Sequence, residues 1–195
     1  MSGAGEVRRY AKGEAKRREI LRAALAVIAE RGYRNSTLQE IADAVGLSKA
    51  GVLHYFDSRE ELMAEVLLER DAQDRAALAS EADDTIDLLS RAAEHNGTVP
   101  GLVQLYSRLV VEGEAPEHPA NGYIRERYAD LVARLADAVR ARQTAGDIRA
   151  DVDPVAVARL ITAASDGLQL QWMYEPRIDM RTILDGMIGL LSPPE

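Results

Sequence analysis

The chain has 195 residues, of which 47% are hydrophobic and none is cysteine, and its formal net charge is −8. This length is enough to bury a substantial core, and the lack of cysteine excludes disulfides and thiolate metal sites. No apolar run has the length of a signal sequence or a membrane span, so we expect a cytoplasmic protein that does not associate with membranes.

The charge is unevenly distributed along the chain. Residues 1–60 contain eleven Lys or Arg against eight Asp or Glu, whereas the remainder contains thirteen against twenty-four. Within the first 22 residues, seven basic side chains face three acidic ones. This asymmetry suits a basic head that meets phosphate and an acidic body that faces away from it. The alternative is a simple solvated tail.

The first helix is predicted over residues 14–31, with apolar side chains at helical spacing and Gly32 as its stop. For the next helix, we expect Ser36 to be the cap and Gln39 to reach back to it as a capping box. Gly46 is predicted to end this helix, because a helix stop needs a residue that tolerates positive φ.

Ser48 is predicted to cap the following helix, whose buried side would be formed by Val52, Leu53 and Phe56. Two short helices joined by a turn that contains glycine are typical of a helix-turn-helix, whose second helix enters the DNA major groove. The alternative is an ordinary helical hairpin. The outer face of small residues and one lysine, Lys49, favours DNA because it packs poorly in a core.

The remainder of the chain is also predicted to be helical. Ser58 and Glu61 indicate a second capping box that opens a helix over residues 59–80. Residues 112–122 are expected to form a loop, because Gly and Pro recur there. Further helices are predicted over residues 84–94, 100–110, 123–144, 154–174 and 180–191. Because no strand alternation occurs, we predict an all-α fold of about nine helices.

The run from Thr37 to Leu62 contains Thr-Leu-Gln-Glu-Ile-Ala, then Ala-Val-Gly-Leu-Ser-Lys, Leu-His-Tyr-Phe and Ser-Arg-Glu-Glu-Leu. This ordered pattern, within about residues 14–67, closely resembles the DNA-binding domain of TetR-type transcriptional regulators. Residues 163–172, Ala-Ala-Ser-Asp-Gly-Leu-Gln-Leu-Gln-Trp, also resemble a late helix of the BetI-type branch of that family.

The resemblance implies two domains. Residues 1–60 would form the DNA-binding helix-turn-helix domain with a basic N-terminal arm, and residues 61–195 the effector-binding and dimerisation domain. The partners implied are double-stranded operator DNA, a second copy of the chain and a small-molecule effector. We expect neither a cofactor nor a bound metal.

Eight residues are candidates for contact with DNA: Thr37, Ser48, Lys49, Ala50, Gly51, His54, Tyr55 and Arg59. Hydroxyl and ammonium groups at a helix start can donate to phosphates or base edges, and small residues let the backbone approach closely. For Gly51 the alternative is that a glycine is merely tolerated. Many family members have Tyr where this chain has Leu53, so that phosphate contact is absent or shifted to His54 and Tyr55. Arg59 matches a position where the family usually has a Lys that binds phosphate.

The body contributes two further sets of candidates. Small or apolar side chains on the last two helices are expected to form a dimer interface, or else to complete the core of the monomer: Ala158, Thr162, Ser165, Ile183, Met187, Ile188 and Leu191. Aromatic and polar side chains are expected to enclose an effector pocket: Tyr106, Tyr123, Tyr128, Asp166, Gln169, Trp172 and Met173. Trp172 is alternatively a structural anchor, and Asp166 either binds a cationic effector or caps a neighbouring helix.

Taken together, these features predict a dimeric, sequence-specific DNA-binding transcriptional regulator, a repressor that a small molecule releases from its operator. The alternative is a dimeric DNA-binding protein whose body binds no effector. We do not expect an enzyme, because the sequence has no Gly-rich phosphate loop, Ser/His/Asp arrangement or metal-binding cluster.

Overall fold

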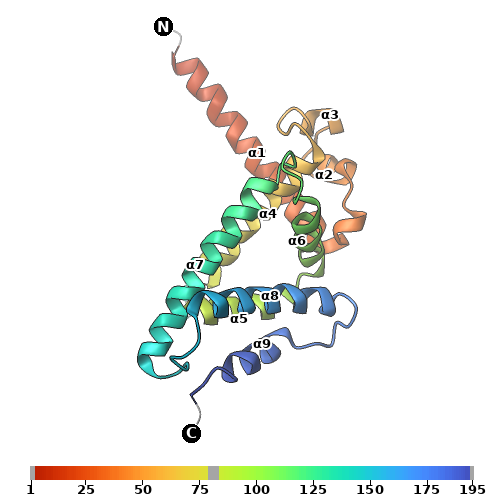
Figure 1. Cartoon of the computed structure of the whole chain (residues 1–195). Helices are drawn as coiled ribbons and strands as arrows, with labels where there is room; N and C mark the ends of the chain where they lie inside the picture. The colour runs from red at the N-terminus through yellow and green to blue at the C-terminus, as the bar shows by residue number, and fades with distance from the viewer. Residues whose placement is uncertain (1–2, 79–83, 194–195) are drawn as a thin grey trace.

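The computed structural model describes residues 3–78 and 84–193. Over these ranges it contains nine α-helices, one short 3-10 helix and no strand, which confirms the predicted all-α fold. A small head lies at one end, α4 and α7 run from it into the body, and α8 and α9 lie at the opposite end (Figure 1). None of the helices in the described part is both long enough and apolar enough to cross a membrane.

The head consists of α1 (Gly3–Arg31), η1 (Tyr33–Asn35), α2 (Leu38–Ala44) and α3 (Lys49–Val52). Its core forms where Ile20 and Ile28 of α1 pack with Ile41 of α2 and Val52 of α3, all four fully buried. The turn after α1 is made at Gly32, whose φ of 77° is a conformation that suits glycine.

The first helix is longer than predicted, because α1 begins at Gly3 rather than at residue 14. Its N-terminal part projects past α2 and α3, away from the body (Figure 1). The side chains of Arg8 and Arg9 lie outside the described residues. From residue 11 onward, Ile20 is the first buried side chain.

The predicted cap of α2 is wrong by one residue. Thr37 is the cap: its hydroxyl accepts the Glu40 N–H at 3.2 Å, and its own N–H donates to the Glu40 carboxylate at 2.8 Å. Ser36 is buried and donates instead to the Tyr33 carbonyl at 2.7 Å, which closes η1. Gln39 donates to Asp43 one turn further on.

The helix-turn-helix itself has the predicted turn. Gly46 has a φ of 65°, and Ser48 caps α3 by accepting the Gly51 N–H at 3.0 Å. However, α3 ends at Val52, and the chain continues as a turn. Because the helical periodicity stops there, Leu53 is 42% exposed rather than buried as predicted, whereas Phe56 is buried.

The link to the body is α4 (Arg59–Leu78). Ser58 accepts the Glu61 N–H at 3.0 Å, as the predicted capping box requires. The Glu61 carboxylate, however, accepts the backbone N–H of Asp57 rather than that of Ser58, so only half of the box is formed. The expected end of this helix at residue 80 lies outside the described residues.

The helices of the body are α5 (Thr85–Asn96), α6 (Pro100–Glu112), α7 (Asn121–Ala145), α8 (Pro154–Trp172) and α9 (Met180–Gly189). As their sequences indicate, Asp84, Asp153 and Asp179 cap α5, α8 and α9, and Gly146 ends α7 in the left-handed region. Residues 113–120 form the predicted irregular segment between α6 and α7.

Two hydrophobic cores hold these helices together. One joins the head to the first half of α4, to α6 and to the start of α7. The other lies among α5, α7, α8 and α9 and contains Trp172. Since the first core contains side chains from both sides of residue 60, such as Phe56 and Leu62, the division into domains at that residue stays a prediction.

Candidate functional site

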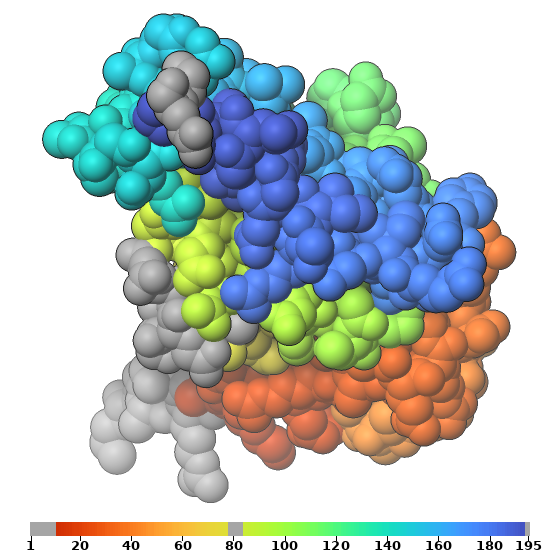
Figure 2. Space-filling view, turned by 90° about the horizontal axis from the view of Figure 1, so that it is seen from below, coloured from red at the N-terminus to blue at the C-terminus, as the bar shows by residue number. Residues whose placement is uncertain are grey.

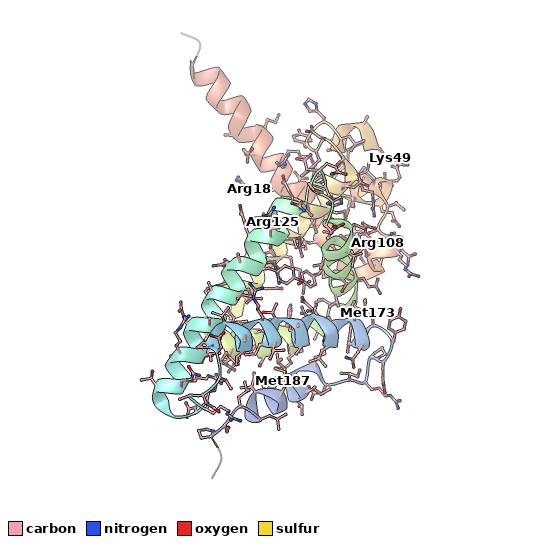
Figure 3. All side chains as sticks on the ribbon, in the orientation of Figure 1. Arg18, Lys49, Arg108, Arg125, Met173 and Met187 are labelled. Atoms are coloured by element: carbon pink, nitrogen blue, oxygen red, sulfur yellow. The ribbon has the colours of Figure 1, made fainter. Side chains whose placement is uncertain are left out.

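The start of α3 is open to solvent. Ser48, Lys49, Ala50 and His54 are exposed, and Lys49 lies on the side of the head that faces away from the body (Figure 3). Within the described residues, the Lys49 ammonium forms no hydrogen bond or ion pair. Thr37, the cap of α2, is also exposed. These are the groups that a helix-turn-helix offers to phosphates and base edges.

Gly51 has a structural explanation within the chain. A methyl group at this position would lie 3.3 Å from the Cβ of Leu47 and 3.4 Å from the Ser48 hydroxyl. A glycine therefore lets α3 pack tightly against the turn that precedes it. A residue without a side chain at this position suits both this packing and a close approach of the backbone to DNA.

Tyr55 and Arg59 are less free than the other candidates. Tyr55 is partly buried and packs against the head core. The Arg59 guanidinium lies 5.2 Å from the centre of the Tyr33 ring. It donates to the Tyr33 hydroxyl at 3.3 Å and to the Ser36 carbonyl at 3.5 Å. A phosphate contact by Arg59 therefore requires an exchange of these bonds.

Arg17 holds the recognition segment in place, a role that no sequence motif indicates. Its guanidinium lies 4.3 Å from the centre of the Phe56 ring and donates to the Tyr55 carbonyl. It also donates to Glu61 at 3.1 Å and to Glu65 at 3.0 Å, both on α4. One side chain thus joins α1, the end of the helix-turn-helix and the start of α4.

The body contains a cavity of about 120 Å³ that is lined by side chains from α4 to α8. Three of the predicted pocket residues line it, namely Tyr106, Asp166 and Gln169. Apolar side chains of α5 and α7, including Leu88, Leu89 and Leu131, form another part of the wall.

A chain of hydrogen bonds crosses this cavity from α4 to α8. Arg127 donates to the Asp71 carboxylate at 2.6 Å and to the Tyr106 hydroxyl at 3.1 Å. Tyr106 donates to Asp166 at 2.9 Å, and Tyr128 donates to the other oxygen of Asp166 at 2.6 Å. The network links charges on α4, α7 and α8 through phenol groups.

The phenols of this network stay protonated. Burial raises the pKa of Tyr106 far above its usual range, and it raises the pKa of Tyr128 to about 12. Each hydroxyl has a single proton, and both protons point to Asp166. The two hydroxyl oxygens therefore lie 3.2 Å apart because both groups donate to the same carboxylate, and not because one donates to the other.

The other predicted pocket residues do not line the cavity. Tyr123 and Tyr128 contribute from behind it, by donating to Asp71 and Asp166. Trp172 is buried in the core of the body, so its alternative as a structural anchor fits the structure. Met173, at the C-terminal end of α8 (Figure 3), lines a separate surface groove beside η1. The Met173 side chain lies outside the cavity, because α8 runs past the cavity before it reaches this end.

Several charged residues of the cavity were not predicted. Arg70 is only 5% exposed; it donates to Asp74 at 3.2 Å and also to Asn96. Arg127 and Arg134 also line the cavity. Arg70 and Asp74 are four residues apart on a helix, which in sequence is typical of a solvated surface pair.

The predicted dimer interface is only partly exposed. Ala158, Thr162 and Ser165 are buried within the chain, because this side of α8 faces α7 and the cavity. Ile188 is 9% exposed, whereas Ile183 lies open on α9. The prediction that the three buried side chains of α8 contact a partner is therefore wrong.

An exposed helix-turn-helix on a helical body with a polar cavity defines a DNA-binding protein of the transcription-regulator class. Comparison with known families agrees. Residues 20–66 match the family described as bacterial regulatory proteins of the tetR family, and residues 111–189 match the C-terminal domain of BetI-type transcriptional repressors. The chain is a TetR-type transcriptional regulator, a family of regulatory proteins rather than enzymes.

Relatives along most of the chain support the same conclusion. The HTH-type transcriptional repressor Rv1474c of Mycobacterium tuberculosis is 28% identical over 79% of this chain and 80% of its own length. A putative transcriptional regulator from Saccharomonospora viridis in complex with choline is 26% identical, with a TM-score of 0.70 over 90% of this chain and 96% of its own. AibR, solved with isovaleryl coenzyme A and operator DNA, has the same fold, with 24% identity and a TM-score of 0.61 over 92% of this chain and 99% of its own. The repressors among these relatives support a DNA-binding transcriptional repressor.

Proposed function

We propose that the chain is a dimeric repressor whose affinity for its operator falls when a small molecule occupies the body cavity. The observation that carries this proposal is the course of α4. It begins directly after the helix-turn-helix, and its residues Arg70, Asp71 and Asp74 line the cavity. A ligand that moves this wall also moves the helix on which the head is mounted.

Both ends of α4 are held by charged contacts. At the head end, Glu61 and Glu65 accept hydrogen bonds from Arg17, which also holds the Tyr55 carbonyl. At the body end, Asp71 accepts from Arg127 of α7. Because these contacts are discrete, a ligand that disturbs the Asp71 end would turn α4 and, through Arg17, the recognition segment. Such a shift requires the ligand to bind one arrangement more tightly than the other.

For the DNA contact, we propose Ser48, Lys49, Ala50, Gly51 and His54 as the residues nearest the groove. Thr37 would offer its hydroxyl to a phosphate. Tyr55 and Arg59 would also contact the DNA, after giving up the contacts that they now make within the head.

The basic arm would add salt-dependent affinity. The N-terminal part of α1 projects from the end of the molecule at which α3 lies (Figure 1). Lys12 and Arg18 on this part are exposed. Their charges are available to the DNA backbone.

For the dimer, we propose the solvent-facing side of α8 together with α9. These helices lie next to one another on the face seen from below (Figure 2). Leu160 of α8 and Ile183 of α9 are exposed. Apart from the neighbouring backbone of its own helix, no described atom lies within 4 Å of the position where a methyl group would stand on Gly167 or Gly186, so a partner helix can approach the backbone closely.

The ligands of related structures support an effector. The Saccharomonospora viridis regulator was solved with choline, and AibR with isovaleryl coenzyme A and operator DNA. In the alternative, a body that binds no effector, the charged side chains that line the cavity would serve only to hold α4 against α5 and α7.

The test begins with an operator selected from a random DNA library. Its affinity is measured by fluorescence anisotropy, first alone and then in a screen of small metabolites. We expect a compound that binds the free protein to lower operator affinity over the same concentration range. If every compound that binds leaves operator affinity unchanged, the effector-free alternative replaces the proposal.

A further inference from the structure

The cavity already contains a cation of its own. The guanidinium of Arg127 lies 4.6 Å from the centre of the Tyr106 ring and donates to the Asp71 carboxylate at 2.6 Å. A cation over an aromatic face is the arrangement by which proteins recognise alkylammonium ligands. In this chain, the position that such a ligand would take is filled by a side chain.

The aspartates that line the cavity are also engaged. Asp166 accepts one phenol on each oxygen, from Tyr106 at 2.9 Å and from Tyr128 at 2.6 Å. Asp74 accepts from Arg70 at 3.2 Å, and Asp71 is bound by Arg127. A cationic ligand would therefore compete with internal donors for every carboxylate of the wall, and it would approach several arginines.

Hydrogen-bond donors, in contrast, are left over. The Nε of Arg134 is buried without a partner. The Nη2 of Arg127 has no acceptor among the described residues, where its Nε and Nη1 are both used. Ser165 and Gln169 are each 6% exposed, and their side chains form no hydrogen bond within the described part of the chain. A buried donor without a partner, such as the Nε of Arg134, is costly. Arg127, Ser165 and Gln169 also line the cavity, so an acceptor group on a ligand could accept from all four side chains.

The remaining wall is apolar and the space is small. Leu88 and Leu89 of α5 and Leu131 of α7 form this wall. The cavity of about 120 Å³ is somewhat smaller than the cavity of about 150 Å³ that accommodates benzene in another protein. The volume therefore suits a small ligand, with a polar head toward α8 and a short chain toward α5.

From these observations we infer that the effector is a small monocarboxylate with a short apolar chain, and that alkylammonium compounds are not effectors. This inference rests on the proposed function, because it concerns the same cavity. It separates the chain from the Saccharomonospora viridis regulator, whose structure contains choline.

Isothermal titration calorimetry on the free protein tests the inference without DNA. The probes are butanoate, butanamide and butylammonium, which share one chain and differ in the charge of the head, together with choline. We expect butanoate to bind at least about tenfold more tightly than the other three. Gln169→Leu should weaken butanoate about tenfold by removing one donor. Gln171→Leu, on the exposed side of the same helix, should leave it unchanged.

Tighter binding of butylammonium or choline than of butanoate would overturn the inference, as would no binding of butanoate or equal binding to the Gln169→Leu variant. The proposed function fails separately, in operator anisotropy. If butanoate binds the cavity but leaves operator affinity unchanged, the ligand class stands and effector control falls. If choline binds and releases the operator, effector control stands and the ligand class falls.

Discussion

Gly101, in the first turn of α6, packs directly on the carbonyl oxygen of Ile28 near the end of α1. A methyl group on Gly101 would lie 2.0 Å from that oxygen and 2.9 Å from the Cα of Gly32. Both neighbours are backbone atoms, which cannot rotate away as a side chain can. This close approach fixes the spacing of α1 and α6 at this point.

Gly101→Ala should therefore destabilise the protein by about 1–3 kcal/mol, because the new methyl group forces α6 away from α1. Chemical denaturation measures the loss. Gly122→Ala is the matched control, since no described atom beyond the neighbouring backbone of its own helix lies within 4 Å of the position of its new methyl group, and its stability should be unchanged or slightly higher. Equal stability of both variants would show that α1 and α6 can move apart to accommodate the methyl group without loss of stability.

Lys49→Ala should weaken operator binding without changing stability, because the ammonium has no partner within the described residues. If it binds a phosphate, the loss should be nearly uniform across operator variants, and the salt slope should fall by about one. Arg177→Ala, with a side chain that is 91% exposed in a loop of the body, should leave both quantities unchanged. An unaltered slope for Lys49→Ala would remove this residue from the interface.

Leu160→Lys should convert the dimer to a monomer, because it places a charge in the face that we propose for the interface. Operator affinity should fall with it, since two recognition helices must be spaced to meet two half-sites. Analytical ultracentrifugation and anisotropy measure the two effects. Val111→Asp, at another exposed apolar position outside that face, is the control. A Leu160→Lys variant that sediments as the wild type would exclude this surface.

The stability of the protein should decline in alkali. Burial raises the pKa of Tyr128 from its ordinary value of 10 to about 12, so the folded state retains a proton that the unfolded chain releases. The contribution to the free energy of unfolding is complete below pH 10 and is lost as the pH rises from about 10 to about 12. Tyr128→Phe should reduce this decline, as followed by urea denaturation at several pH values. An identical pH profile for the variant would contradict the role of Tyr128.

Local features of the fold were predictable from the sequence. Asp153 and Asp179 cap α8 and α9, and Gly46 and Gly146 end their helices, because caps and positive-φ stops depend on a few neighbouring residues. The cap of α2 was misassigned since Ser36 and Thr37 are both good caps. Only the competing hydrogen bond of Ser36 to η1 decides between them.

The cavity was harder to predict, because it depends on which helix faces are turned inward. On α4, Arg70 and Asp74 have the spacing of a solvated pair, yet they are enclosed by α5. On α8, small residues occur on several sides. Ser165, buried beside α7, and Gly167, with open space next to it, look equally suited to a partner helix in sequence. Only the tertiary packing determines which of these positions is buried and which is exposed.

The central claim, that a ligand in the cavity lowers the affinity of the head for the operator, is tested most directly by thermodynamic reciprocity. The affinity of the cavity ligand, butanoate or whichever of the four probes binds most tightly, is measured by calorimetry with and without saturating operator. If the ligand lowers operator affinity by some factor, operator must lower ligand affinity by the same factor, and we expect a factor between about 5 and 150. Equal ligand affinity in the presence and absence of operator would contradict the account.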